Sequence, residues 1–141
     1  MDGLTFVPLT ASYIAQIEDW LTPDTEESVS MLPMAATGRL NEARSQGWVA
    51  LHDNLPVAIA TLNVGSQGVG HLNFLVKPSE RRLGIGASLV SYVLDQPAVR
   101  AVRTLEAFVE FDNTAAQKIL TRDGFSNIGY TPDGRLRFEK R

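Results

Sequence analysis

The sequence predicts one α/β domain with elements in the order β-α-α-β-β-β-α-β-α-β-β. Three patterns lead to this prediction: helical spacing of apolar side chains over 13–21, an apolar run over 72–76 interrupted only by Asn73, and alternation with a period of two over 105–111. The run over 72–76 suits a strand that is covered on both faces. The 141 residues suffice for one core but not for two, so we expect a single domain over 1–141.

Turn and proline signals separate the elements of the first half. Thr10 or Ser12 can cap the first helix, and Pro23 ends it. Residues 53–56 predict a turn between two strands, and the glycines within 65–70 predict another. We therefore expect strands over 4–9, 47–51, 57–62 and 72–76 and helices over 13–21 and 34–45.

Similar signals bound the elements of the second half. Pro97 stops a helix that carries the apolar pattern after the glycines near residue 85. Thr114 and Gln117 can form a capping box, and Gly124 is suited to the position just past a helix. We expect helices over 87–94 and 115–120 and strands over 105–111, 125–130 and 135–139.

Composition narrows the possible functions. The net charge is −3 and the isoelectric point is about 5.3, which argues against nucleic acid as a partner. The absence of cysteine excludes disulfides, thiolate metal sites and a cysteine nucleophile, and no metal site is expected. No stretch approaches the ~20 apolar residues of a membrane helix, and no signal peptide is recognisable. A cytoplasmic protein without membrane association is the expectation.

Residues 76–86 form a basic, glycine-punctuated loop between a strand and a helix. Such a loop directs several backbone N–H groups and the positive end of the helix dipole at one point, where an anion can bind. The loop does not match a Walker loop, because it lacks that motif's lysine. It does not match a Rossmann fingerprint either, because Leu89 stands at the position of the third glycine. Lys77, Arg81 and Arg82 form the one basic cluster and coincide with this loop, so a phosphate-bearing ligand is expected.

Three further motifs point to a family. Arg81–Gly86 matches the pattern [QR]-x-x-G-x-[GA], and Val76-Lys77-Pro78 precedes it. Asn113 begins an N-x-x-A segment, and Gly124-Phe125 follows at the usual spacing. In these residues, which span 72–125, the chain resembles the GNAT superfamily of N-acetyltransferases. The resemblance implies a mixed, mostly antiparallel sheet of six to seven strands flanked by about four helices. It also implies a V-shaped splay between the fourth and fifth strands, here 72–76 and 105–111.

The resemblance implies acetyl-CoA as the cosubstrate. Its pantetheine arm enters the splay, where the backbone of Leu75 and Val76 and the side chain of Asn113 are expected to bond it. Val76 N–H is the expected donor to the oxyanion. A helix N-cap is the alternative role of Asn113, and the two roles are compatible. The pyrophosphate is expected at the loop, on the residues Arg81, Arg82, Leu83, Gly84, Ile85, Gly86 and Ala87.

The chain departs from the family where catalysis is concerned. The tyrosine that serves as general acid stands seven residues after the asparagine of N-x-x-A, and that position is Leu120. In the branch that acetylates ribosomal-protein N-termini, a glutamate base stands five residues before that asparagine, and that position is Phe108. Tyr130 is one substitute for the missing acid. A thiolate can also leave unassisted, so transfer does not require this group.

The remaining candidates for catalysis lie on the two central strands. Glu110 and Glu106 flank Phe108 on one strand face, and either can act as a base through water, with Glu110 preferred. Surface charge on an alternating strand is the alternative for both. His71 is either a base or a hydrogen-bonding residue at the start of the strand. Asn73 bonds either within the sheet or to an acceptor amine.

These observations predict an N-acetyltransferase that moves an acetyl group from acetyl-CoA to a primary amine by direct attack in a ternary complex. The acceptor is a small molecule or a protein amino group, and the acidic balance favours a cationic amine. A non-catalytic acetyl-CoA sensor that regulates a partner protein is the alternative, favoured by the missing acid and base. The protein is expected to be a monomer or a homodimer.

Overall fold

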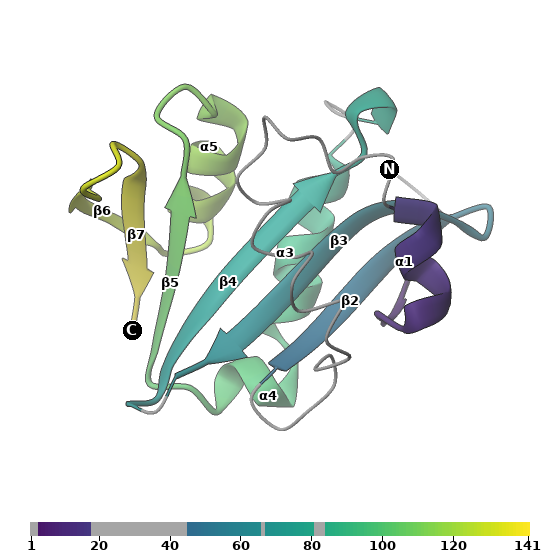
Figure 1. Ribbon diagram of the computed structural model, residues 1–141, viewed down its shortest axis with the longest axis horizontal. Coiled ribbons are helices and arrows are strands. Elements are labelled where there is room, and N and C mark those ends of the chain that lie inside the picture. Colours follow the sequence, from purple (N-terminus) through teal and green to yellow (C-terminus); the bar gives the residue numbers. More distant parts are fainter. Residues whose placement is uncertain (1–2, 18–44, 66, 81–83) are drawn as a thin grey trace.

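Seven strands form one mixed sheet in the computed structural model, which describes residues 3–17, 45–65, 67–80 and 84–141 (Figure 1). The spatial order is β1-β2-β3-β4-β5-β7-β6. Neighbouring strands run antiparallel except for β4 and β5, which run parallel. The strands are β1 (Leu4–Pro8), β2 (Ser45–His52), β3 (Leu55–Val64), β4 (Val69–Val76), β5 (Thr104–Val109), β6 (Ser126–Tyr130) and β7 (Leu136–Lys140). The expected mixed, mostly antiparallel sheet is therefore confirmed.

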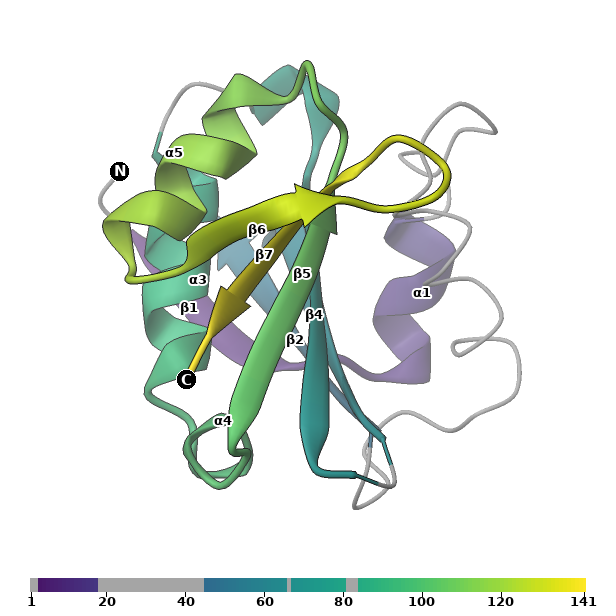
Figure 2. The ribbon, with the colours of Figure 1, turned by 90° about the vertical axis from the view of Figure 1, so that its left-hand side faces the viewer.

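Helices cover both faces of this sheet (Figure 2). Helix α1 (Ala11–Ile17) lies on one face. Helices α3 (Ile85–Leu94) and α5 (Thr114–Arg122) lie on the other and contact each other. Two short elements complete the described helices: the 3₁₀ helix η2 (Pro78–Glu80) and α4 (Pro97–Arg100). This arrangement leaves the sheet with two distinct cores.

The two cores follow from the alternation of side chains along the strands. Leu62 and Leu72 pack with Leu89 and Leu120 between the sheet and helices α3 and α5. Their neighbours Ile59 and Leu75 point to the opposite face and pack in a smaller cluster with Leu9 and Ile17 near α1. The central strands β3 and β4 are therefore covered on both sides, as the apolar run over 72–76 predicts.

Strands β4 and β5 are paired over only part of their length. The ladder joins Val69 to Thr104, Gly70 to Leu105 and His71 to Glu106, and it ends there. Beyond these pairs β4 continues to Val76 and β5 to Val109, and Figure 1 shows the two ribbons diverging. The sheet opens at the strand pair for which the sequence resemblance implies a splay.

Several boundaries differ from the sequence expectation. β4 begins at Val69 rather than at residue 72, because Gly70 belongs to the ladder and not to the turn. β2 already includes Ser45, so the helix expected over 34–45 is wrong at that residue, and 34–44 lie outside the described residues. α1 begins at Ala11 and is described as far as Ile17. The helix α4 was not expected.

The start and end of α5 show one wrong prediction and one that is confirmed. Thr114 and Gln117 do not form the capping box. Asn113 is the N-cap instead, and its Oδ1 accepts a hydrogen bond from Ala116 N at 3.2 Å. At the other end Gly124 has φ of 95° and follows the C-cap residue, as expected of a residue that ends a helix.

Candidate functional site

A crevice lies between the diverging strands. Its walls are residues 72–74 of β4, residues 107–109 of β5, and Asn113 and Ala116 at the start of α5. Because the ladder between the strands has already ended, β3 is the only sheet neighbour of this part of β4 among the described residues. An extended ligand can therefore lie along β4 where a neighbouring strand would otherwise pair. Asn73 and Phe108 line the same crevice from the two strands.

Asn113 stands at the wall of this crevice with half of its amide group in use. The side-chain Oδ1 caps α5 through Ala116 N, while the main-chain N–H of Asn113 donates to Glu110 O at 3.0 Å. The side-chain NH₂ is the donor that a ligand in the crevice could use. The cap and the proposed contact with the cofactor are thus compatible, as the sequence suggested.

The start of α3 follows the C-terminal end of β4. Gly84 is the N-cap with φ of 78° and ψ of 8°, a left-handed conformation that glycine adopts without strain. Gly84 O accepts the bond from Ser88 N, while the N–H groups of the first turn have no partner within the helix. Such groups attract an anion, and the helix dipole adds to the attraction. Arg81, Arg82 and Leu83 lie outside the described residues.

The other described residues of this loop are buried or half-buried. The side chain of Ile85 is buried in the core, so only its main chain can serve a ligand. Gly86 lies against β4 and α5, where an added Cβ would meet Val76 Cγ2 at 3.1 Å and Ile119 Cδ1 at 3.3 Å. Ala87 is half-buried, and its carbonyl accepts a bond from Arg122 Nη2.

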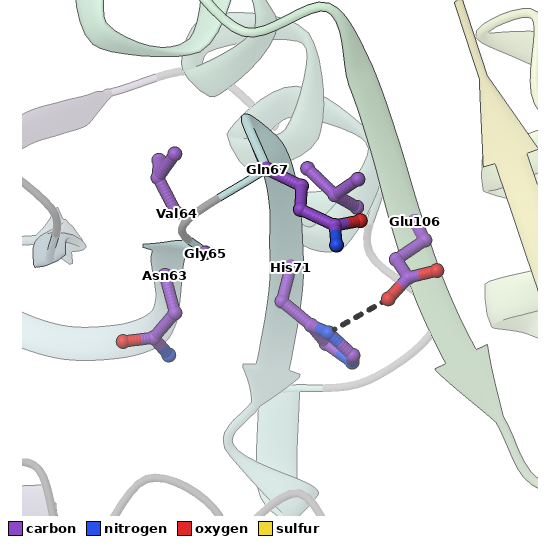
Figure 3. Close-up of a pocket in the computed structure, with 7 residues that line it drawn as sticks. Asn63, Val64, Gly65, Gln67, His71 and Glu106 are labelled. Carbon is purple, nitrogen blue, oxygen red and sulfur yellow. Dashed lines mark ion pairs between the residues drawn. The ribbon is translucent and has the colours of Figure 1, made fainter.

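A row of polar residues crosses the opposite face of the sheet from the one that α3 covers. Asn63 of β3 is paired with His71 of β4, which is paired with Glu106 of β5, which is paired with Glu139 of β7. Asn63, His71 and Glu106 line a hollow of about 380 Å³, whose other walls are Val64, Gly65, Gln67 and Val69. Figure 3 shows His71 and Glu106 pointing toward one another from neighbouring strands.

Glu106 holds two partners at once. Its Oε1 lies 3.1 Å from His71 Nδ1, and its Oε2 lies 3.0 Å from Arg137 Nη2 on β7. The carboxylate is only 14% exposed, which strengthens both interactions relative to a surface pair. Arg137 also lies 3.9 Å from Glu139. The result is a polar network that runs across β4, β5 and β7.

Aromatic contacts fix the position of the histidine ring. The ring of His71 meets the ring of Phe108 edge to face, with centroids 4.5 Å apart. The guanidinium of Arg135 lies over the ring of Phe108, with its Cζ 5.2 Å from the ring centroid. Since Phe108 also lines the crevice, His71 contacts a residue of the crevice wall.

Burial lowers the pKa of His71 below its ordinary value of 6.5. The charge of Glu106 opposes this shift, and the charges of Arg135 and Arg137 reinforce it. The imidazole is therefore neutral at pH 7. Because a carboxylate only accepts hydrogen bonds, Nδ1 carries the proton toward Glu106, and Nε2 keeps a lone pair.

The other catalytic candidates from the sequence lie elsewhere. Glu110 follows the last residue of β5, and it is not part of the lining of the hollow among the described residues. Its carbonyl accepts bonds from Asn113 N and Gln117 Nε2. Tyr130 is 73% exposed on β6, and Leu120, at the family's tyrosine position, is fully buried.

Sequence reasoning missed Arg137 and the hollow. Arg137 alternates with the buried Leu136 and Phe138, which signals only a solvent-facing strand position. Its contact with Glu106 depends on the register of β7 against β5, which no local pattern encodes. In the described part of the chain, no helix is long and apolar enough to cross a membrane.

Comparison with known proteins supports one family. The family model described as the acetyltransferase (GNAT) family matches residues 14–125. No protein of curated function matches the sequence significantly. Among solved structures, a GNAT acetyltransferase from Staphylococcus aureus Mu50 is similar with a TM-score of 0.79 and 15% identity, covering 97% of this chain and 98% of that one.

Two further similar structures contain the cofactor. PaiA N-acetyltransferase from Thermoplasma acidophilum, in complex with coenzyme A, has a TM-score of 0.77 at 13% identity over 98% of both chains. YncA from Salmonella typhimurium, a putative acetyltransferase with acetyl-CoA, has a TM-score of 0.79 at 15% identity, covering 99% of this chain and 94% of that one. At such identities the likeness establishes the fold.

Proposed function

The chain belongs to the GNAT acetyltransferase family, and from this premise we propose that it transfers an acetyl group from acetyl-CoA to a primary amine by direct attack in a ternary complex. The observation that carries the proposal is the end of the β4–β5 ladder at His71 and Glu106. The crevice lies beyond this point, the start of α3 follows the C-terminal end of β4, and the polar hollow lies beside the last paired residues. A cofactor and an acceptor can thus approach one point from two faces.

We place the cofactor along β4. The pyrophosphate is assigned to the loop 81–87, supported by the left-handed N-cap Gly84 and the first turn of α3. The pantetheine arm is assigned to the crevice, with main-chain bonds to Leu75 and Val76 and a side-chain bond from Asn113. The crevice walls, which include Asn113, support the placement of the arm, and Leu75 and Val76 directly follow these walls on β4.

The chemistry requires a neutral amine, a positioned donor for the oxyanion and a departing thiolate. The amine nitrogen attacks the thioester carbonyl carbon, the C–N bond forms, and the C–S bond breaks. A main-chain N–H of β4 within residues 72–74, which line the crevice, is assigned to the oxyanion. Thiols have a pKa of about 8.5, so the thiolate is a competent leaving group without a tyrosine acid.

A non-catalytic acetyl-CoA sensor is the second candidate. Leu120 at the usual tyrosine position and Phe108 at a glutamate position favour it. Leu120 is fully buried in the apolar core and carries no proton to donate. In this candidate the cofactor binds in the same crevice but no acetyl group is transferred.

Binding and turnover together separate the two candidates. Calorimetry with acetyl-CoA and coenzyme A measures binding, and thiol release with a panel of primary amines measures transfer. The enzyme is expected to bind acetyl-CoA and to release thiol only when an amine is present, with the acetylated amine identified by mass. Binding without any acetylated product supports the sensor, and the absence of binding overturns both candidates.

A further inference from the structure

The hollow beside His71 is a separate space from the crevice and is adjacent to it. The two share no lining residue, but Phe108 lines the crevice and contacts the His71 ring, which lines the hollow. His71 and Glu106 are the last paired residues before the sheet opens. A molecule in the hollow therefore lies next to the end of the crevice at which it could reach a bound thioester carbonyl.

The chemistry of the walls limits what the hollow can hold. Among the described residues that line it there is one carboxylate, Glu106, and no Lys or Arg. Asn63 and Gln67 add neutral amides, and two valines add apolar surface (Figure 3). A volume of about 380 Å³ suits a small molecule. An acceptor with its own carboxylate finds no opposite charge in these walls and meets a like charge at Glu106.

His71 is oriented as a base is oriented in a dyad. Nδ1 faces Glu106 Oε1 at 3.1 Å, which leaves Nε2 with its lone pair. Arg137 holds the second oxygen of Glu106 at 3.0 Å and so fixes the carboxylate plane. The charged groups that act on His71 in the described structure are Glu106, Arg135 and Arg137. Asn63, its neighbour on β3, does not titrate.

Resting on the proposed function, we propose that this hollow binds the acceptor, a small primary amine without a carboxylate, and that His71 is the general base. Glu106 and Arg137 act as positioning residues. His71 Nε2 takes one proton from the ammonium and releases it to solvent. The free amine attacks the thioester carbonyl carbon, the C–S bond breaks, and the second proton that the nitrogen loses goes to the thiolate. The products are an amide, coenzyme A thiol and one proton released to solvent.

The test compares pH profiles of kcat/KM for wild type and for His71→Gln, Glu106→Gln and Arg137→Met. His71→Gln is expected to lower kcat/KM by about 10²- to 10⁴-fold and to abolish the acidic limb of the profile. Glu106→Gln shifts that limb to lower pH, because the charge that favours imidazolium is lost. Arg137→Met shifts it to higher pH, because a charge that disfavours imidazolium is lost.

Opposite shifts of the acidic limb in Glu106→Gln and Arg137→Met are not expected if His71 has only a structural role. Arg100→Met is the matched control, since Arg100 is an exposed arginine of α4 that lines neither the crevice nor the hollow, and its profile should equal that of wild type. Acetyl-CoA affinity, measured by calorimetry, should be unchanged in all four variants. Retained activity in His71→Gln with loss in Glu110→Gln overturns the inference and leaves the proposed function standing.

The acceptor class is tested with norvalinamide and norvaline, which have the same shape and differ in one negative charge. After correction for the fraction of free amine, kcat/KM is expected to be at least about tenfold higher for norvalinamide, corresponding to 1.4 kcal/mol. Glu106→Gln should reduce this ratio. Equal or better use of norvaline overturns the assignment of the hollow. Failure of wild type to bind acetyl-CoA instead refutes the proposed function itself.

Discussion

Substituting Ala for Gly86 tests how closely α3 is held against β4. The added Cβ would lie 3.1 Å from Val76 Cγ2 and 3.3 Å from Ile119 Cδ1, both shorter than ordinary van der Waals contact. Accommodating a methyl group in a packed site costs roughly 1–3 kcal/mol. Gly86 is the second residue of α3, so only part of the roughly 1 kcal/mol that Ala gains over Gly in a helix interior offsets that cost. We therefore expect Gly86→Ala to lower the free energy of unfolding by about 1 kcal/mol.

Urea unfolding of a double-mutant cycle isolates the contact. Ile119→Val removes the Cδ1 methyl that the new Cβ would meet, and alone it costs about 0.5–1.5 kcal/mol. The double variant should lose less than the sum of the single losses, by about 0.5 kcal/mol or more. Gly84→Ala is the control: its φ of 78° strains an L-residue by about 1–2 kcal/mol, but its Cβ meets nothing within 4 Å.

The loss in Gly84→Ala should be additive with that in Ile119→Val. Additivity of Gly86→Ala with Ile119→Val, or a Gly86→Ala variant more stable than wild type, would falsify the packing role of this glycine. A measured loss of acetyl-CoA affinity in Gly86→Ala adds a functional readout, because the same shift displaces the start of α3 from the end of β4.

Three further outcomes follow from burial, capping and titration. Leu120→Ala should cost about 2–5 kcal/mol in urea unfolding because the side chain is fully buried, and a loss under 1 kcal/mol contradicts its place in the core. Asn113→Ala should cost about 1 kcal/mol in thermal unfolding through loss of the cap to Ala116 N, with Asn113→Ser recovering most of it. His71 has its pKa lowered in the folded state, so the unfolded chain binds more protons near pH 6 and wild-type stability rises as the pH increases toward and past 6.5. The stability of wild type relative to His71→Gln should therefore be greater at pH 8 than at pH 5, and an unchanged or reversed difference contradicts the shift.

The fold was predictable where its signals are local. Gly124 ends α5 as the sequence indicates, and the bonds from Phe125 N to Leu120 O at 2.9 Å and from Gly124 N to Thr121 O at 3.2 Å complete the cap. The prediction of a turn at Gly70 is wrong, because glycine also occurs where neighbouring side chains come close to a strand. A Cβ there would lie 3.0 Å from Leu105 and from Leu62, so this glycine serves the ladder and not a turn.

The candidate site was only partly predictable from the sequence. The alternation over 105–111 placed Glu106 and Phe108 on one face, and the structure agrees. That Glu106 contacts both His71 and Arg137 requires the registers of β4 and β7 against β5, and these are set by packing across the whole sheet. The sequence alone thus named His71 and Glu106 as candidates but favoured Glu110 as the base.

The position of the dyad at the last rung of the β4–β5 ladder has a mechanical consequence. His71 and Glu106 are directly paired residues of two strands, so the sheet itself fixes the separation of their backbones. One residue further along, the strands diverge and a paired contact of this kind is no longer available. A base placed here combines the rigidity of a paired strand with access to the opening, which loops provide less well. The chain has Leu120 and Phe108 at the positions of the family's tyrosine and glutamate, and His71 with Glu106 supplies polar groups at the last rung of the ladder, next to the crevice.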